Sequence, residues 1–260
     1  MASNLVIETM LNRKSIRRYK DESPSDEVIH TIVRAGQQAP FASQLYSVLL
    51  SRKKGSPFDA PLLFTVCLDV HKLELIMARR NWQFVTNDMD VLILGIQDAA
   101  LMAENMVIAA ESFGLGSCFL GAAPYVAGKI AQEYRLPKRV FPVVQLAMGY
   151  PAEEPTPRPR YPIEFVLFED VYPQLSEEAI ERAMKQMDEG YLAQDYYRKA
   201  QYIIPLEGDR KEAFTFNSYG WTEHISRKWG QWHLSPADLL AQLRQRGFDI
   251  LGLENAGESE

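Results

Sequence analysis

Cysteine is scarce in this sequence, which has only two among its 260 residues. Cys67 and Cys118 stand in the apolar stretches FTVCLDV and GSCFLG, and neither a CxxC pair nor a Cys/His cluster accompanies them. This pattern argues against a disulfide framework and against the usual zinc motifs. We therefore expect two buried thiols in a reducing compartment, and no metal site.

Export and membrane signals are also lacking. The N-terminal stretch MASNLVIETMLNRK does not have the basic and then apolar order of a signal peptide. The most apolar run, VLILGIQDAALMAENMVIAA from Val91, is interrupted by Asp98 and Glu104, which a membrane span seldom tolerates. The sequence predicts a cytoplasmic protein without a membrane partner.

Net positive charge is missing as well: the formal net charge is -6, which argues against nucleic acid as a partner. Against this background, NRKSIRRYK from Asn12 to Lys20 places five cations in nine residues. A second basic pair, Arg158 and Arg160, lies in the proline-rich stretch PAEEPTPRPRYP. Solvated surface is the ordinary explanation of such groups. The alternative is a pocket for a phosphate, which binds several cations together with a hydroxyl donor.

Familiar catalytic motifs are absent too, since no nucleophile elbow, P-loop, HExxH or GxGxxG occurs. The four histidines do not stand beside Ser or Cys in a triad-like context, and we interpret them as structural or surface residues. If the chain is an enzyme, the missing acid–base set indicates that a bound cofactor supplies the chemistry.

Apolar periodicity predicts a mixed α/β or α+β protein with about five strands. Helices are expected over 4–11, 23–40, 90–113, 125–136, 175–200 and 235–248. Strands are expected over 46–51, 62–69, 117–121, 141–149 and 163–168. The second strand is almost continuously apolar, which is typical of a central strand.

The domain organisation is expected to be simple. We predict a core over residues 1–172, a helical extension of the same domain over 173–253, and a disordered tail over 254–260. The helix over 90–113 is apolar nearly all round, so it should be buried on more than one side, as in a dimer.

A family resemblance brings these observations together. RKSIRRY, residues 13–19, matches the R-[RK]-S-x-R-x-[FY] opening of the nitroreductase family of FMN-dependent oxidoreductases. Three more segments occur in that family's order and resemble its A group, the NADPH-dependent nitroreductases and flavin reductases. They are DAALMAENMVIAAESFGLGSCFLGAA, MGYPAEEPTPRPRYP, and the set YYRKA, GWTEHISRK and LLAQLRQRGF. The resemblance covers the chain from about residue 5 to residue 250.

The resemblance implies an α+β three-layer sandwich: a mostly antiparallel sheet of about five strands flanked by helices, with a helical C-terminal extension. It also implies a homodimer with FMN at the interface. NADPH, or NADH, would pass hydride to N5 of FMN, and a nitroaromatic, quinone or flavin would then be reduced in a ping-pong mechanism without a catalytic side chain. The alternatives are a non-catalytic FMN carrier or sensor, and an interaction protein whose basic groups are merely solvated.

Matched positions imply a phosphate clamp. Arg13, Lys14 and Ser15 would hold the phosphate and ribityl chain of FMN. Arg158 and Arg160 would close on the same phosphate.

Matched positions also imply contacts with the flavin ring. Arg17 would lie near its pyrimidine end, where a cation stabilises the negative charge of reduced flavin. The backbone of Phe119, Leu120, Gly121 and Ala122 would pass beside the ring, and glycine there permits close approach.

Two segments depart from the family pattern. APFASQLYSVLL is shorter and less polar than the family's loop, and Phe41, Ser43 and Gln44 are expected to contact the flavin there. SRKKGSPFDAPLLF lacks the helix that brings a glutamine to the flavin in the A group. These departures leave the acceptor open. Four cations are candidates for the NADPH 2′-phosphate: Arg198, Lys199, Arg210 and Lys211.

Overall fold

A computed structural model describes residues 4–53, 55–233 and 235–252. The chain forms two compact units, one drawn from residues 1–155 and 235–260 and the other from residues 156–234. The boundary expected near residue 172 lies inside the second unit, and the chain returns to the first unit at residue 235. The tail expected over 254–260 lies outside the described residues.

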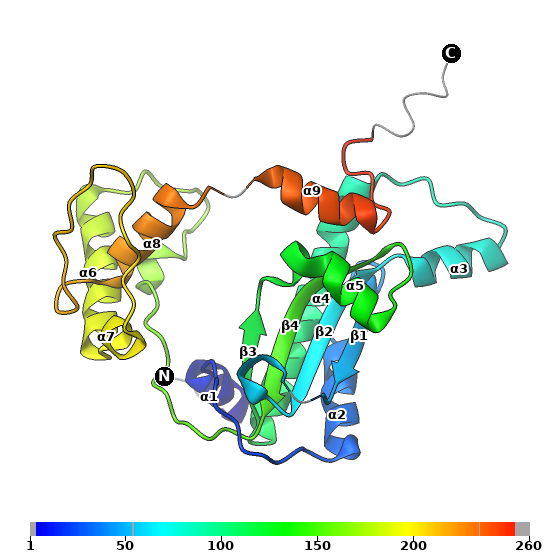
Figure 1. Ribbon diagram of the computed structural model, residues 1–260, viewed down its shortest axis with the longest axis horizontal. Coiled ribbons are helices and arrows are strands. Elements are labelled where there is room, and N and C mark those ends of the chain that lie inside the picture. Colours follow the sequence, from blue (N-terminus) through cyan, green and yellow to red (C-terminus); the bar gives the residue numbers. More distant parts are fainter. Residues whose placement is uncertain (1–3, 54, 234, 253–260) are drawn as a thin grey trace. The chain divides into compact units, whose positions relative to one another are not determined.

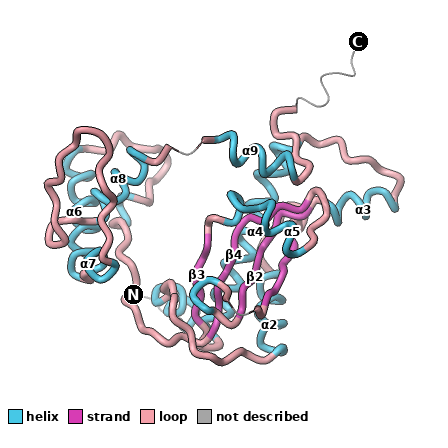
Figure 2. The backbone as a smooth tube through the Cα atoms, viewed as in Figure 1, coloured by secondary structure: helices cyan, strands magenta, loops and turns pink. Residues whose placement is uncertain are grey.

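A four-stranded antiparallel sheet forms the centre of the first unit, in the order β1-β2-β4-β3 (Figures 1 and 2). Its strands are β1 (Tyr46–Ser51), β2 (Leu62–Asp69), β3 (Gly116–Leu120) and β4 (Val140–Gly149). Four of the expected strands are therefore confirmed, and so is the central place of β2.

The fifth expected strand, over 163–168, is wrong. Ile163–Phe165 forms a single 3₁₀ turn, η3, and its N–H groups bond locally: Phe165 N lies 3.0 Å from Pro162 O, and Leu167 N lies 2.9 Å from Ile163 O. Ile163, Val166 and Leu167 are exposed. The apolar residues of this segment predicted a strand. No described strand pairs with its backbone, so its hydrogen bonds are made within the turn.

Helices cover both faces of the sheet, which confirms the α+β class and the three-layer arrangement. Helices α2 and α4 lie on one face and α5 with α9 on the other (Figure 1). The helices of this unit are α1 (Leu5–Asn12), α2 (Asp26–Gln37), α3 (His71–Arg79), α4 (Asp88–Ser112), α5 (Ala127–Tyr134) and α9 (Pro236–Gln245). Two 3₁₀ turns, η1 (Pro57–Asp59) and η2 (Ala123–Val126), lie between them.

The main core fills the space between the sheet and the pair α2 and α4. Phe64 and Leu146 of the sheet pack there with Ile32 of α2 and with Met102 and Met106 of α4. Burial of such side chains stabilises the fold by roughly 1.5–3 kcal/mol each. On the opposite face, Cys118 and Ala147 pack with Ala60, and Cys67 is also buried. The expectation of two buried free thiols is confirmed.

Helix α4 is the longest element, and its burial is one-sided. By length and composition alone it could cross a membrane, but nine of its residues are buried, and it packs on α2 and the sheet as a core helix does. The other side of α4 stays exposed in the single chain. Five apolar residues there are 39–49% exposed: Met89, Ile93, Leu94, Ile96 and Leu101. The expected burial on more than one side, as in a dimer, therefore stays a prediction.

The second unit is helical and rich in aromatic residues. It contains α6 (Glu177–Ala193), α7 (Tyr196–Ala200) and α8 (Trp221–Gln231), and its core holds Met187, Tyr191, Tyr197 and Tyr219. The single helix expected over 175–200 is in fact broken at Asp195, which adopts a left-handed conformation with φ of 50°.

Candidate functional site

The basic segment lies beside β3, the edge strand of the sheet. Ser15 forms a parallel bridge with Ser117, and Ile16 N donates a 2.9 Å hydrogen bond to Ser117 O. The Ile16 side chain is only 2% exposed. A Cβ at Gly116 would lie 2.4 Å from Ile16 Cγ1, so only glycine permits this approach. The sequence therefore places the segment firmly against the sheet.

Tyr19 fixes the C-terminal half of the segment. Its hydroxyl oxygen lies 2.6 Å from Ile16 O and 3.1 Å from Ala147 O. Burial raises the pKa of Tyr19, so the phenol remains a donor at neutral pH. Beyond it, Ala152 N donates to Arg18 O at 2.9 Å, which joins the segment to the chain that follows β4.

Two glutamates after β4 meet the basic segment. Glu153 Oε1 accepts the backbone N–H groups of Arg17 and Arg18, at 2.5 and 3.2 Å. Glu154 forms an ion pair with Lys14, whose side chain is 19% exposed while that of Glu154 is 79% exposed. Sequence reasoning had treated this acidic pair only as part of a proline-rich loop. The only sequence feature that could have indicated this role is the pair of adjacent acidic residues between β4 and Arg158.

Polar atoms without partners lie next to this segment. Among the described residues, Arg13 Nη1, Glu111 Oε1 and Ser117 Oγ are buried and have no hydrogen-bond partner. Burial raises the pKa of the Glu111 carboxyl, and the charges of Arg13 and Lys14 oppose that rise. Buried polar groups are nearly always paired in folded proteins, so orphaned donors such as Arg13 Nη1 mark a place for a ligand or water.

The turn after β3 leaves open space. Phe119 is partly exposed, Gly121 and Ala122 are exposed, and Leu120 is half-buried. A Cβ built on Gly121 would meet no described atom within 4 Å. The protein itself therefore does not require glycine here, and the expected passage of this backbone beside a flavin ring stays a prediction.

The loop of residues 41–45 is tied to α4 by one buried carboxylate. Asp98 accepts three backbone N–H groups, at 2.7, 3.2 and 3.0 Å, from Ala42, Ser43 and Leu45. Phe41, Ser43 and Gln44 are exposed, and Gln44 has φ of 52°. Sequence reasoning missed this role of Asp98, because the residue was considered only as a polar break in an apolar run.

The shortened segment around residue 58 approaches the basic segment. It forms only the three-residue turn η1, in which Phe58 and Asp59 have φ of 62° and 51°. The guanidinium of Arg17 lies 6.0 Å from the centroid of the Phe58 ring. Phe58 is thus the aromatic neighbour of the cation that was assigned to the pyrimidine end of the flavin.

Arg158 and Arg160 belong to the second unit. Arg158 Nη1 donates to Gln194 Oε1 at 2.8 Å, and its guanidinium lies 3.9 Å from the centroid of the Tyr196 ring. Arg160 Nη1 donates to the carbonyls of Arg158 and Pro159, at 3.0 and 3.1 Å. Their joint clamp with the basic segment of the first unit stays a prediction.

The four candidate cations for a nicotinamide cofactor also lie in the second unit. Arg198 is 3.5 Å from Asp195, and Lys199 Nζ donates to Gln194 O at 2.9 Å. Arg210 and Lys211 are exposed on the loop before α8. The choice among them stays open.

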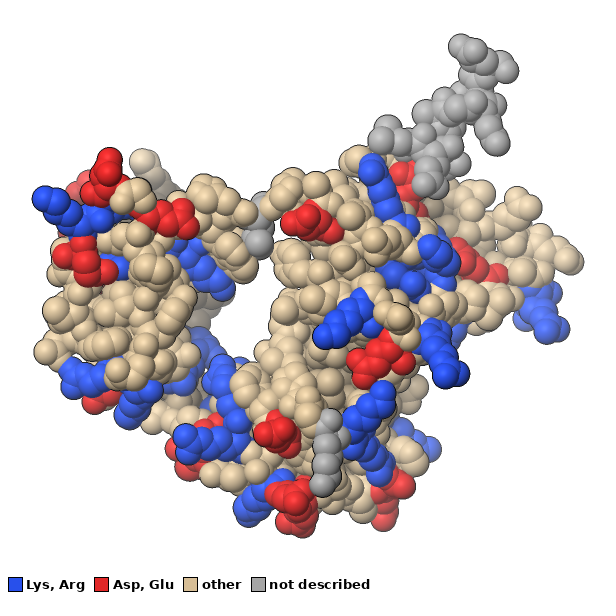
Figure 3. Space-filling view, viewed as in Figure 1, with Lys and Arg blue, Asp and Glu red and all other residues tan. Residues whose placement is uncertain are grey.

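Charges of both signs are mixed on the face of the first unit that Figure 3 shows. Within the described part of the chain, no group of three or more His, Cys, Asp or Glu side chains is placed to hold a metal ion.

Comparisons with known proteins identify the family of this chain. The model of the nitroreductase family matches residues 10–52 and 51–150. A Staphylococcus haemolyticus protein named "NADPH-dependent oxidoreductase" is 28% identical, over 95% of this chain and 98% of its own. A Bacillus subtilis protein named "FMN reductase (NADPH)" is 29% identical, over 82% of this chain and 89% of its own.

Solved structures show the same fold. The NfrA1 nitroreductase from B. subtilis superposes with a TM-score of 0.76 at 26% identity, over 94% of this chain and 98% of its own. NfrA2 from B. megaterium gives a TM-score of 0.81 at 23% identity, over 95% of this chain and 99% of its own. The family model alone spans more than half of the 260 residues. The chain belongs to the nitroreductase family.

Proposed function

We propose that this protein is an FMN-dependent NAD(P)H oxidoreductase that reduces a small-molecule acceptor. The observation that carries the proposal is the orphaned guanidinium nitrogen of Arg13, buried in a basic segment that is fixed against β3. Family membership supports the proposal. So do the relatives from Bacillus subtilis and Staphylococcus haemolyticus, whose names state FMN reduction with NADPH and NADPH-dependent oxidoreduction.

The residues present fit FMN. Arg13, Lys14 and Ser15 would hold its phosphate, since a phosphate accepts charge-assisted hydrogen bonds that contribute roughly 1.5–3 kcal/mol each. The open space at Gly121 would admit the ring. The chemistry that bound FMN supplies is two-electron transfer between a nicotinamide donor and an acceptor.

The protein's own residues would then bind FMN and orient it. Glu153 accepts from the backbone N–H groups of Arg17 and Arg18, which fixes the backbone from which the Arg17 side chain extends. Arg17 supplies positive charge for a developing negative charge. Arg158 and Arg160 remain candidates for a second set of phosphate contacts. Because no side-chain base is required, we propose ping-pong kinetics, in which the oxidised donor leaves before the acceptor binds.

The remaining expectations concern the oligomeric state, the acceptors and the cellular location. A homodimer is proposed because α1 and α4 leave apolar side chains exposed in the single chain. Nitroaromatics, quinones and free flavins are the proposed acceptors. A cytoplasmic location stays a prediction from the sequence.

The test is the visible spectrum of the purified protein with added FMN, followed by NADPH under anaerobic conditions. We expect a bound-flavin spectrum that bleaches with NADPH and recovers when a quinone is added. Arg13→Gln should weaken FMN binding about tenfold or more. Arg18→Gln should not, since its hydrogen bonds to the described residues are made by its backbone alone. A bound flavin that NADPH does not bleach would favour a carrier or sensor. Failure to bind FMN at all would contradict the proposal.

A further inference from the structure

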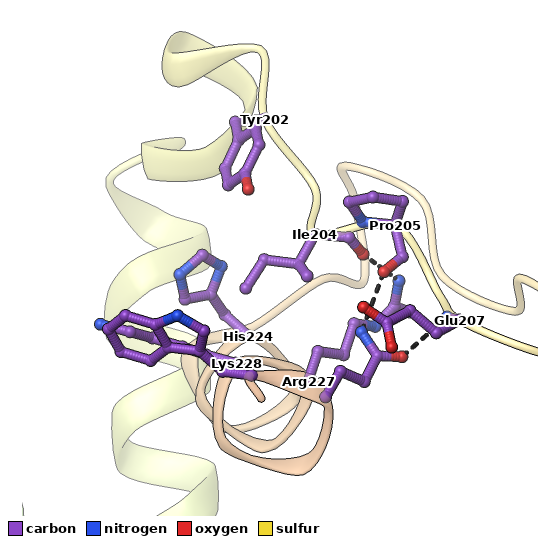
Figure 4. A pocket seen from close by; sticks show the side chains of 9 residues that line it. Tyr202, Ile204, Pro205, Glu207, His224, Arg227 and Lys228 are labelled. Atoms are coloured by element: carbon purple, nitrogen blue, oxygen red, sulfur yellow. Dashed lines mark hydrogen bonds between the residues drawn. The ribbon is translucent and has the colours of Figure 1, made fainter. Parts of the chain in front are cut away.

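A cleft in the second unit is separate from the residues assigned to FMN. It has a volume of about 500 Å³ and lies between residues 202–207 and helix α8 (Figure 4). This volume is within the range of small-molecule pockets. Its lining residues are Tyr202, Ile204, Pro205, Glu207, His224, Arg227, Lys228, Gln231 and Trp232.

The shape of the cleft is fixed by hydrogen bonds of two lining side chains, Arg227 and Gln231. Arg227 is 3% exposed and donates to Glu223, to Ile204 O, and twice to Glu212, at 2.7–2.8 Å. Gln231 accepts from Glu207 N at 2.9 Å and donates to Pro205 O at 3.0 Å. These bonds tie residues 204–207 to α8, so the cleft is shaped before any ligand arrives.

Two nitrogen groups among the lining residues remain available. Lys228 Nζ lies 4.7 Å from the centroid of the Trp232 ring, and within the described ranges it has no hydrogen bond and no ion pair. His224 uses Nδ1 with the Tyr219 hydroxyl, at 3.2 Å, which leaves Nε2 for another partner. Burial, followed by the charges of Lys228 and Arg227, lowers the pKa of His224, so its ring is neutral at neutral pH. Lys228 is therefore the cation that a ligand would meet.

The walls of the cleft favour a flat apolar body. Tyr202 and Trp232 are partly exposed, and Ile204 and Pro205 also line the cleft. Figure 4 shows the hydroxyl end of Tyr202 directed toward His224, and the two ring centroids are 6.3 Å apart. One carboxylate, Glu207, stands among the lining residues, and its Oε2 is 3.8 Å from His233 Nε2. An aromatic ring would be contacted by these side chains, with one anionic group near Lys228.

We propose that this cleft is a binding site for an aromatic carboxylate: the ring lies between Tyr202 and Trp232, and the carboxylate accepts from Lys228. The orientation follows from charge, because an anion is attracted to Lys228 and repelled by Glu207. The site does not depend on the proposed FMN chemistry.

The probe is 2-naphthoate, titrated calorimetrically into the full-length protein, with neutral 2-naphthamide as the comparison. We expect saturable binding of the carboxylate and binding about tenfold weaker for the amide. Lys228→Gln should raise the Kd of 2-naphthoate about tenfold. Lys185→Gln, which changes an exposed lysine of α6 paired with Glu189, should leave it unchanged.

Three outcomes would overturn the proposal. The first is no saturable binding of 2-naphthoate. The second is equal affinity of wild type and Lys228→Gln, which would place the ligand elsewhere. The third is tighter binding of 2′-AMP than of 2-naphthoate with the same loss in Lys228→Gln, which would make the cleft a nucleotide site. Far-ultraviolet circular dichroism of each variant checks that the fold is kept.

Discussion

At the scale of single residues, two arginines with buried guanidinium nitrogens differ in whether the protein supplies their hydrogen-bond partners. Arg227 has four side-chain hydrogen bonds to Glu223, Glu212 and Ile204, and its pKa is raised mainly by Glu212. Arg13 has a buried Nη1 atom with no partner in the described part of the chain. Because an unpaired buried donor is destabilising by roughly 1–3 kcal/mol, Arg13 is the better candidate for ligand binding.

Lys14 leads to a prediction at the same scale, because its ammonium group already forms an ion pair with Glu154. A bound phosphate would have to compete with that carboxylate. Glu154→Gln should therefore lower the Kd for FMN about two- to fivefold, the range expected for an exposed ion pair. The measurement is quenching of FMN fluorescence at low ionic strength. Riboflavin, which lacks the phosphate, should bind wild type and variant equally well. Weaker FMN binding by the variant would show that Glu154 supports the site.

At the scale of elements, the loop of residues 41–45 depends on α4 through Asp98. Asp98→Ala would leave three backbone N–H groups without their acceptor. We expect it to reduce the free energy of unfolding by roughly 2–4 kcal/mol and to loosen the loop that carries Phe41, Ser43 and Gln44. Urea denaturation measures the first effect, and proteolysis within the loop measures the second. Glu104→Gln, an exposed change on the same helix, is the control, and equal stability of both variants would contradict this role.

Local patterns accounted for much of the fold at this scale. The four paired strands and α4 were predictable because their apolar residues follow strand or helix spacing and are buried where they stand. The 163–168 segment has a similar apolar pattern, but none of the described strands pairs with it. The break at Asp195 is a single backbone conformation within a helical pattern. Neither the missing pairing nor the helix break changes the apolar periodicity of the sequence, so neither could be predicted from it.

The candidate site was less predictable, because its supports come from distant parts of the chain. The basic segment was recognisable from its own letters and from family resemblance. Glu153 and Glu154 act on residues almost 140 positions away, and Asp98 acts on a loop more than 50 positions away. One sequence gives no signal for such pairings, so these carboxylates were seen only as loop or helix residues.

At the scale of the whole molecule, the two basic groups proposed to bind the FMN phosphate belong to separate compact units. The basic segment is part of the first unit, while Arg158 and Arg160 belong to residues 156–234. Substitution of Arg158 and Arg160 alone therefore tests whether both units contribute to FMN binding. The first unit contains Arg13, whose buried Nη1 has no partner among the described residues. We therefore expect substitutions in the basic segment to weaken FMN binding more than substitutions of Arg158 and Arg160.

The exposed apolar side of α1 and α4 carries the last prediction, that of a homodimer. On α1, Leu5, Val6, Met10 and Leu11 are 54–75% exposed, and α1 contacts α4 and ends directly before the basic segment. Exposed apolar side chains of this kind are typical of an interface, and an aspartate or glutamate placed among them is costly to bury. We expect light scattering to show a dimer at micromolar concentration, and Ile93→Glu to shift it toward monomer and lower its FMN content. Leu75→Glu, at a 55% exposed leucine of α3, should do neither. A wild-type monomer that binds FMN fully would show that the site is complete within one chain.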